Sequence, residues 1–251
     1  MSKIKSRRHA LPTLGEMAAR PDGNEMDTFD VPTTRETRLV RVLAGNATLD
    51  GELVLPRRAT GIVLFAHGSG SSRASPRNRY VAKTMQDAGI ATLLFDLLTP
   101  HEDERYETRF DIGLLTARLL AATDWVSRES PAAGLALGYF GASTGAAAAL
   151  AAAAALGSRI RAVVSRGGRP DLAGPHALAR VRAATLLIVG GHDPEVIELN
   201  RSAFDELHCE KALQIVPGAT HLFEEPGTLE QVAVLARNWF RRWLVGESRA
   251  H

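Results

Sequence analysis

Short apolar runs that alternate with helical segments restrict the fold of this chain more than any other feature of its sequence. Residues 62–66 (Ile-Val-Leu-Phe-Ala) are entirely apolar, and residues 90–95 (Ile-Ala-Thr-Leu-Leu-Phe) contain a single threonine. Runs of this kind, without polar alternation, are typical of strands that are buried on both faces. Longer segments with helical spacing lie between them. The alternation predicts an α/β fold with a mostly parallel sheet and helices on both of its faces.

Local sequence signals mark where these elements begin and end. Ser75 is suited to begin a helix and Gly89 to end it, and Gly45 with Asn46 separates two strands as in a hairpin. The expected strands are residues 38–44, 48–55, 62–66, 90–95, 135–140, 160–165, 186–189 and 213–216. The expected helices are residues 76–88, 106–126, 144–156, 195–207 and 229–244.

The first part of the chain differs from the rest. Pro12, Pro21 and Pro32 interrupt residues 1–34, which show little periodicity. We expect a flexible N-terminal extension there, with a short helix near residues 14–19. A single α/β domain is expected over residues 35–251, because no repeat and no second apolar core is found in the sequence.

Composition restricts the partners and the compartment. The chain has 30 Lys and Arg residues against 28 Asp and Glu, and its basic clusters are not interleaved with aromatic side chains, so no nucleic-acid partner is expected. No run reaches the roughly 18–20 apolar residues of a membrane-spanning helix, so no membrane partner is expected. Cys209 is the one cysteine, and residues 1–20 lack the apolar stretch of a secretory signal, which favours a cytoplasmic protein. A homo-oligomer remains open.

The segment Gly141-Ala142-Ser143-Thr144-Gly145 is the strongest signal of chemistry. A predicted buried strand leads directly into it, and an alanine-rich predicted helix follows, which is the context of a nucleophile elbow. Glycines are needed there because the sharp strand-to-helix turn leaves no room for side chains. We therefore expect Ser143 to be a nucleophile; the alternative is an idle serine in a glycine-rich turn.

Residues 67–72 (His-Gly-Ser-Gly-Ser-Ser) follow another buried strand and fit an oxyanion-binding loop. A serine nucleophile produces a tetrahedral oxyanion that two N–H groups must already face. We expect the backbone N–H groups of Ser69 and Thr144 to fill this role. His67 is interpreted as a residue that packs the loop. A phosphate-binding loop is disfavoured because no Gly-Lys-Ser/Thr sequence follows.

An acid and a base should follow the serine in the chain, each after its own strand. Asp193 follows strand 186–189, and His221 follows strand 213–216, so both are expected at the same sheet edge as Ser143. Asp171 is the alternative acid. The alternative bases are His192, His176 and His208.

No metal site is expected. His101-Glu102-Asp103-Glu104 does not have the His-Glu-x-x-His spacing, and no partner ligands lie at a consistent offset. We interpret the segment as a solvated acidic loop.

Over residues 38–246 the chain resembles an α/β-hydrolase, and more narrowly the dienelactone hydrolase family. The segments that carry the resemblance are 67–73 (HGSGSSR), 75–78 (SPRN), 138–145 (GYFGASTG), 190–193 (GGHD) and 218–223 (GATHLF). The resemblance implies an eight-stranded, mainly parallel sheet and hydrolysis of an ester-like bond without a cofactor. Relatives of this type also occur beside phosphoribosyltransferase domains, and we expect no such domain in these residues.

One residue departs from the family pattern. Dienelactone hydrolases use a cysteine nucleophile, whereas this chain has Ser143 at that position. The departure favours a serine esterase that works through an acyl-enzyme. The same triad would also serve a thioesterase, an acyltransferase or a peptidase, and a non-catalytic binding protein on a hydrolase scaffold is the alternative of a different class.

The substrate is expected to be a small-molecule ester. Only residues 166–185 separate the strands 160–165 and 186–189, so no large cap domain fits there, and a small or short-chain acyl group is favoured. Arg166 and Arg169 lie in that segment. They are candidates for binding a substrate carboxylate. The alternative is that both are surface residues that only cap the loop.

Overall fold

The computed structural model describes residues 35–128 and 131–244. The predicted extension over residues 1–34, with its short helix, lies outside the described residues. So do residues 129–130 and 245–251.

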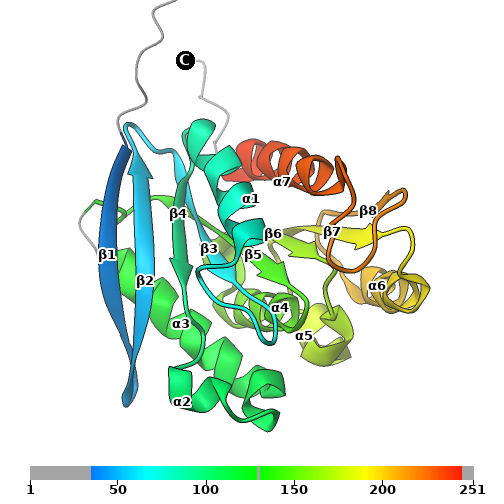
Figure 1. Ribbon diagram of the computed structural model, residues 1–251, viewed down its shortest axis with the longest axis horizontal. Helices are drawn as coiled ribbons and strands as arrows, with labels where there is room; N and C mark the ends of the chain where they lie inside the picture. The colour runs from blue at the N-terminus through cyan, green and yellow to red at the C-terminus, as the bar shows by residue number, and fades with distance from the viewer. Residues whose placement is uncertain (1–34, 129–130, 245–251) are drawn as a thin grey trace, which may run out of the picture. The chain divides into compact units, whose positions relative to one another are not determined.

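An eight-stranded sheet in the order β1-β2-β4-β3-β5-β6-β7-β8 forms the centre of the domain (Figure 1). The strands are β1 (Arg35–Ala44), β2 (Ala47–Pro56), β3 (Gly61–Ala66), β4 (Ala91–Phe95), β5 (Ala136–Ala142), β6 (Ile160–Arg166), β7 (Ala184–Gly190) and β8 (Lys211–Val216). Strand β2 pairs antiparallel with β1 and with β4, and all other pairs are parallel. The predicted α/β-hydrolase fold with a mostly parallel sheet is confirmed.

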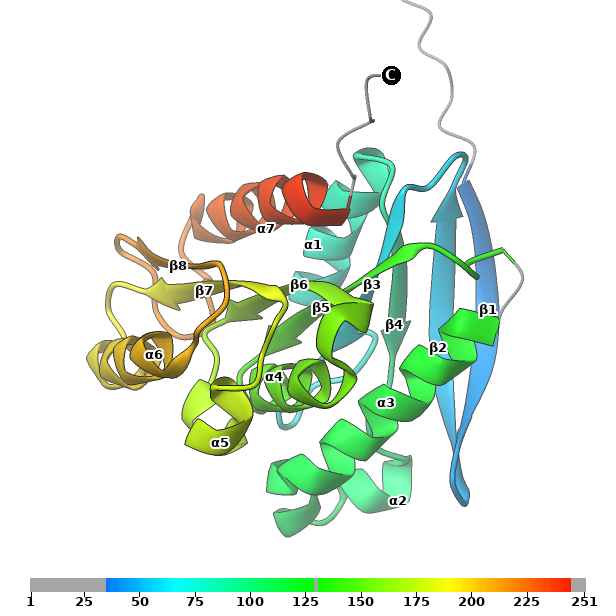
Figure 2. The same ribbon diagram turned by 180° about the vertical axis from the view of Figure 1, so that it is seen from behind.

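Two helical layers cover this sheet, as the views from the two sides show (Figure 2). Helices α1 (Pro76–Asp87) and α7 (Thr228–Leu244) pack on one face, over a cluster that includes Phe65 and Phe140. Helices α3 (Ile112–Arg128), α4 (Thr144–Leu156) and α6 (Pro194–Glu206) cover the other. Every residue of β3, β4 and β7 is buried, which explains why these strands are almost entirely apolar.

The expected helix at residues 106–126 begins later than its periodicity predicts. Residues of this stretch form the short helix η1 (Glu107–Phe110), which follows α2 (Pro100–Asp103), and α3 begins at Ile112. The carboxylate of Asp111 accepts a hydrogen bond from the Leu114 N–H at 2.9 Å. This side chain therefore caps the helix and sets its start.

Two short elements between β6 and β7 were not predicted. They are η3 (Pro170–Ala173) and α5 (Pro175–Leu178), each begun by a proline. No large cap domain lies in this connection, as expected.

The parallel strands β3 to β8 all end at one edge of the sheet, and the loops that follow them gather there. Within the described residues, no helix combines the length and the apolar character needed to cross a membrane.

Candidate active site

Ser143 lies between the last residue of β5 and the first residue of α4, in a strained backbone conformation. Its φ of 49° and ψ of −123° are outside the regions that a serine normally adopts. The N–H of Ser143 donates to the carbonyl of Arg166 at 3.3 Å, and its carbonyl accepts from the N–H of Arg169 at 3.1 Å. The end of β6 and the loop that follows it thus hold the elbow by their backbone.

The two glycines of the elbow are required for steric reasons. A Cβ atom on Gly145 would lie 2.2 Å from the carbonyl oxygen of Ala66, and one on Gly141 would lie 2.4 Å from Cα of Ala146. Backbone atoms cannot move aside as a flexible side chain can. The close packing of α4 against β3 and β5 therefore depends on both residues.

His221 and Asp193 meet at the ends of β8 and β7. His221 Nδ1 lies 2.7 Å from Asp193 Oδ2, and the two side chains are 38% and 17% exposed. The surrounding loops are joined by backbone bonds: Gly191 N–H donates to Val216 O, and His192 N–H donates to Ala219 O, both at 2.9 Å. The pair is therefore fixed by the backbone of both loops.

Gly190 allows these loops to approach. A Cβ atom there would lie 2.5 Å from the carbonyl oxygen of Ala219 and 2.6 Å from that of Thr220. The contact places Asp193 beside the segment that carries His221. The Gly190-Gly191 pair after an apolar run was the signal for this approach in the sequence.

Gly167 connects the serine to the histidine. It follows Arg166, whose carbonyl binds Ser143 N–H, and a Cβ atom built on Gly167 would lie 3.6 Å from Cε1 of His221. The three predicted residues therefore share one edge of the sheet. No hydrogen bond joins Ser143 Oγ to His221 in the described structure, a separation often seen in hydrolases without substrate.

Phe223, two residues after His221, is a site feature that the sequence did not reveal. It has a φ of 56° although it is not a glycine, and its side chain is 1% exposed. The ring lies under Gly167 and 6.0 Å from the guanidinium carbon of Arg166. Burial of the ring in the core stabilises this unusual turn.

The loop after β3 approaches the elbow closely. A Cβ atom on Gly68 would lie 3.0 Å from Cβ of Ser143. The Ser69 N–H donates to Thr144 Oγ1 at 3.0 Å, so a side chain already occupies this expected oxyanion donor. This bond was not expected from the sequence.

His67 packs the same loop, as expected. Its Nε2 accepts from the N–H of Leu97 at 3.0 Å, and its Nδ1 lies 3.0 Å from the carbonyl oxygen of Gly68, to which it donates in the neutral tautomer. Burial lowers the pKa of His67 below its ordinary value, which favours the neutral form.

Arg166 and Arg169 differ sharply in their surroundings. Arg169 donates two hydrogen bonds to Asp171, at 2.9 and 2.8 Å, so its guanidinium already has a carboxylate partner. Arg166 is 8% exposed, and its Nε and Nη1 atoms have no hydrogen-bond partner. Burial, with Arg77 nearby, lowers the pKa of Arg166 to about 10, so it stays charged at neutral pH.

The residues considered as an alternative acid or base do not take part in the His221–Asp193 contact. Asp171 binds Arg169, whereas Asp193 binds His221. His176, His192 and His208 are exposed, and their side chains make no hydrogen bond within the described residues. Of the expected acidic loop at residues 101–104, residues 101–103 belong to α2, and Glu102 pairs with Arg118 at 2.7 Å. The described residues contain no group of three or more potential ligands that could hold a metal ion.

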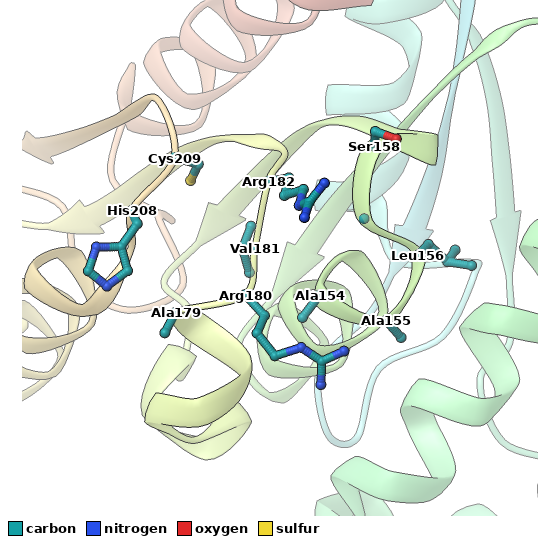
Figure 3. Close-up of a pocket in the computed structure, with 11 residues that line it drawn as sticks. Ala154, Ala155, Leu156, Ser158, Ala179, Arg180, Val181, Arg182, His208 and Cys209 are labelled. Carbon is teal, nitrogen blue, oxygen red and sulfur yellow. The ribbon is translucent and has the colours of Figure 1, made fainter.

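A cavity of about 720 Å³ lies away from these residues (Figure 3). It is lined by the end of α4 and by the segments that lead into β7 and β8, including Arg180, Arg182 and Cys209. These segments precede parallel strands, so the cavity is at the opposite edge of the sheet from Ser143. None of the residues that line this cavity belongs to the site around Ser143, Asp193 and His221.

The chain is similar to a solved dienelactone hydrolase from Anabaena variabilis. The two share 57% sequence identity with a TM-score of 0.81, over 84% of this chain and 99% of that one. The esterase domain of a Rhodothermus marinus protein is 19% identical with a TM-score of 0.68, over 83% of this chain and 99% of that domain, which shows a common fold. No model of a known protein family matches the sequence.

Among curated proteins, two from Mycobacterium tuberculosis strains carry the name "Putative phosphoribosyl transferase" and are 58% identical over 225 residues. The match covers 90% of this chain and 50% of theirs, so the chain spans about half the length of these relatives. The hydrolase from Anabaena variabilis, by contrast, is matched over nearly its whole length. On that identity and coverage, the chain belongs to the dienelactone hydrolase family.

Proposed function

We propose that this protein is a serine hydrolase that cleaves carboxylic esters with small or short-chain acyl groups. The observation that carries the proposal is the His221–Asp193 contact at 2.7 Å, at the same sheet edge as the strained Ser143. Membership of the dienelactone hydrolase family supports the reaction class. The absence of a large cap domain between β6 and β7 supports a small substrate.

In the proposed mechanism His221 accepts the proton of Ser143 Oγ as that oxygen attacks the ester carbonyl. Asp193 holds the imidazole so that the proton is on Nδ1 and stabilises the imidazolium that forms. His221 then gives the proton to the leaving alkoxide as the acyl-enzyme forms. Water attacks this ester in the second step, with His221 again as the base.

The oxyanion of each tetrahedral intermediate would be bound at the start of α4, where the loop after β3 approaches the nucleophile. Thr144 is the first residue of α4, where backbone N–H groups have no partner within the helix. The positive end of the helix dipole adds to this stabilisation. The Ser69 N–H, which the sequence suggested as the second donor, donates to Thr144 Oγ1 and so lies next to this site.

The buried guanidinium of Arg166 supports a substrate that carries a carboxylate. A buried charge without a partner is costly, and an anionic group of the substrate would supply the missing counter-charge. Arg166 is therefore the stronger candidate of the two arginines. Arg169 would take this role only if it released Asp171.

The name of the Mycobacterium tuberculosis relatives does not lead us to propose phosphoribosyl transfer for this chain. Those proteins are about twice as long as the matched region, whereas the described domain corresponds to a whole dienelactone hydrolase. A thioesterase or acyltransferase reaction would use the same residues. Comparison of ester, thioester and amide substrates separates these activities.

The first test is covalent labelling of the wild type and Ser143→Ala by a fluorophosphonate, followed by intact mass measurement. We expect a single adduct on the wild type and none on the variant. Hydrolysis of 4-nitrophenyl acetate should be lost in parallel. A wild type without adduct or activity would contradict the proposal and favour a binding protein on a hydrolase scaffold.

A further inference from the structure

The hydrogen bond from Ser69 N–H to Thr144 Oγ1 joins the two halves of the proposed oxyanion site. Its length is 3.0 Å, and Thr144 is 2% exposed. The hydroxyl therefore lies at the junction of the loop after β3 and the start of α4. Gly68, the neighbour of Ser69, packs directly against Ser143, so this junction is beside the nucleophile.

The hydrogen-bonding capacity of this hydroxyl is only half used. A threonine hydroxyl can donate one hydrogen bond while it accepts another. Thr144 Oγ1 accepts from Ser69, and within the part of the chain that the structure describes no acceptor is hydrogen-bonded to its proton. A buried hydroxyl proton without an acceptor is unfavourable, and a negatively charged oxygen would be a strong acceptor for it.

We propose that the Thr144 side-chain hydroxyl is itself a donor to the oxyanion, with the Ser69 N–H behind it as its support. The inference rests on the proposed hydrolase function and assigns a new role within the same site. When the Ser143 Oγ–carbon bond forms, the carbonyl electron pair moves onto oxygen. Thr144 then faces that oxygen with its backbone N–H and its O–H, and no proton is transferred from either.

The hydrogen bond from Ser69 has two effects on the Thr144 hydroxyl in this arrangement. A hydroxyl that accepts a hydrogen bond becomes a better donor, because the two bonds polarise each other. The same bond restrains the threonine rotamer, so the donor needs little reorganisation during the reaction. A valine at this position would fill the same space but offer neither contact.

The test compares Thr144→Val with Thr144→Ser in 4-nitrophenyl acetate hydrolysis. Loss of an oxyanion donor lowers kcat by about 10²-fold, so we expect a fall of that order for Thr144→Val with little change in KM. Thr144→Ser keeps the hydroxyl and should remain within about threefold of the wild type. Inhibition by 2,2,2-trifluoroacetophenone, which forms a hemiketal with the serine, should weaken by the same factor as kcat/KM in Thr144→Val.

The alternative is a site of two backbone donors in which Ser69 N–H binds the oxyanion directly. Thr144→Val would then match or exceed the wild-type kcat, and that result would overturn the inference. A parallel change of KM and kcat would assign Thr144 to loop anchoring and would also overturn it. If thermal unfolding shows that Thr144→Val is not folded, Thr144→Ala is compared with Thr144→Ser in its place. A wild type inert to ester and fluorophosphonate would instead refute the underlying hydrolase function.

Discussion

His221 Nδ1 and Asp193 Oδ2 are 2.7 Å apart, although 28 positions of the chain separate the two residues. The contact depends on Gly190, because a side chain at this position would prevent the backbones of the loops after β7 and β8 from packing together. The histidine is thus oriented from its Nδ1 side, and in the proposed mechanism its Nε2 atom accepts the serine proton. That mechanism requires the tautomer with the proton on Nδ1, which the Asp193 carboxylate favours.

Replacement of Asp193 by Asn should lower kcat by about 10³- to 10⁴-fold, because the amide no longer stabilises the imidazolium or the required tautomer. Asp171→Asn is the matched control, since Asp171 binds Arg169 and not His221. It should keep the wild-type rate within a few-fold. Steady-state rates with a neutral ester measure both effects. A larger loss in Asp171→Asn than in Asp193→Asn would identify Asp171, and not Asp193, as the acid.

Gly145→Ala should destabilise the protein by about 3 kcal/mol or more, since the new methyl group would overlap the carbonyl oxygens of Ala66 and His67. Gly113→Ala is the control, because that position is within α3 and the nearest obstacle to a Cβ is the Asp111 side chain at 3.3 Å. It should be neutral or stabilising by up to about 1 kcal/mol. Denaturant unfolding followed by circular dichroism gives both values. Equal stabilities would contradict the steric account.

Below pH 6.5 the protein should lose stability through His67. Burial lowers the pKa of this residue in the folded state, so the unfolded chain takes up the proton first as the pH falls. The stability contribution is thus present above pH 6.5 and decreases until the pH reaches the lowered folded pKa. In His67→Gln, the difference in the free energy of unfolding between pH 7.5 and 5.5 should be smaller than in the wild type. An identical difference would contradict the assignment.

Arg166→Gln should reduce kcat/KM for an ester that bears a carboxylate by about 10- to 100-fold, as expected for one charge-assisted hydrogen bond. The rate for a neutral ester of the same length should change little. Arg169→Gln is the control, because its guanidinium is paired with Asp171. If Arg166→Gln left the preference between the two esters unchanged, the proposal that the substrate carries a carboxylate would be refuted.

The same substitution has a second expected outcome. Arg166 carries a buried charge with two unpartnered nitrogen atoms, so its removal should leave stability unchanged or increased. Denaturant unfolding measures this at neutral pH. A marked loss of stability would indicate that the guanidinium serves the core rather than a ligand.

The alternation of strands and helices was predictable from the sequence, because β3, β4 and β7 lack the regular polar positions of amphipathic helices. The elbow around Ser143 was predictable for a related reason: its glycines are visible as residue types. The start of α3 was not, because Asp111 caps the helix inside a stretch whose apolar spacing continues on both sides.

Other features depend on contacts between distant segments. The sequence suggested one loop for Arg166 and Arg169, yet Arg166 ends β6; Asp171 pairs with Arg169, and no carboxylate of the described residues pairs with Arg166. The Ser69–Thr144 bond likewise joins residues 75 positions apart. Neither a composition nor a local pattern shows which polar atoms end up paired.

Phe223, with its left-handed backbone and buried ring, anchors the turn that carries His221 to the core. Because its fully buried ring packs with the α7 face, the turn that carries His221 cannot change shape without opening that face. A solvent-exposed loop would lose its geometry long before the rest of a heated protein. Because the turn of His221 is anchored in the core, we expect heat to disrupt its geometry only when the whole domain unfolds.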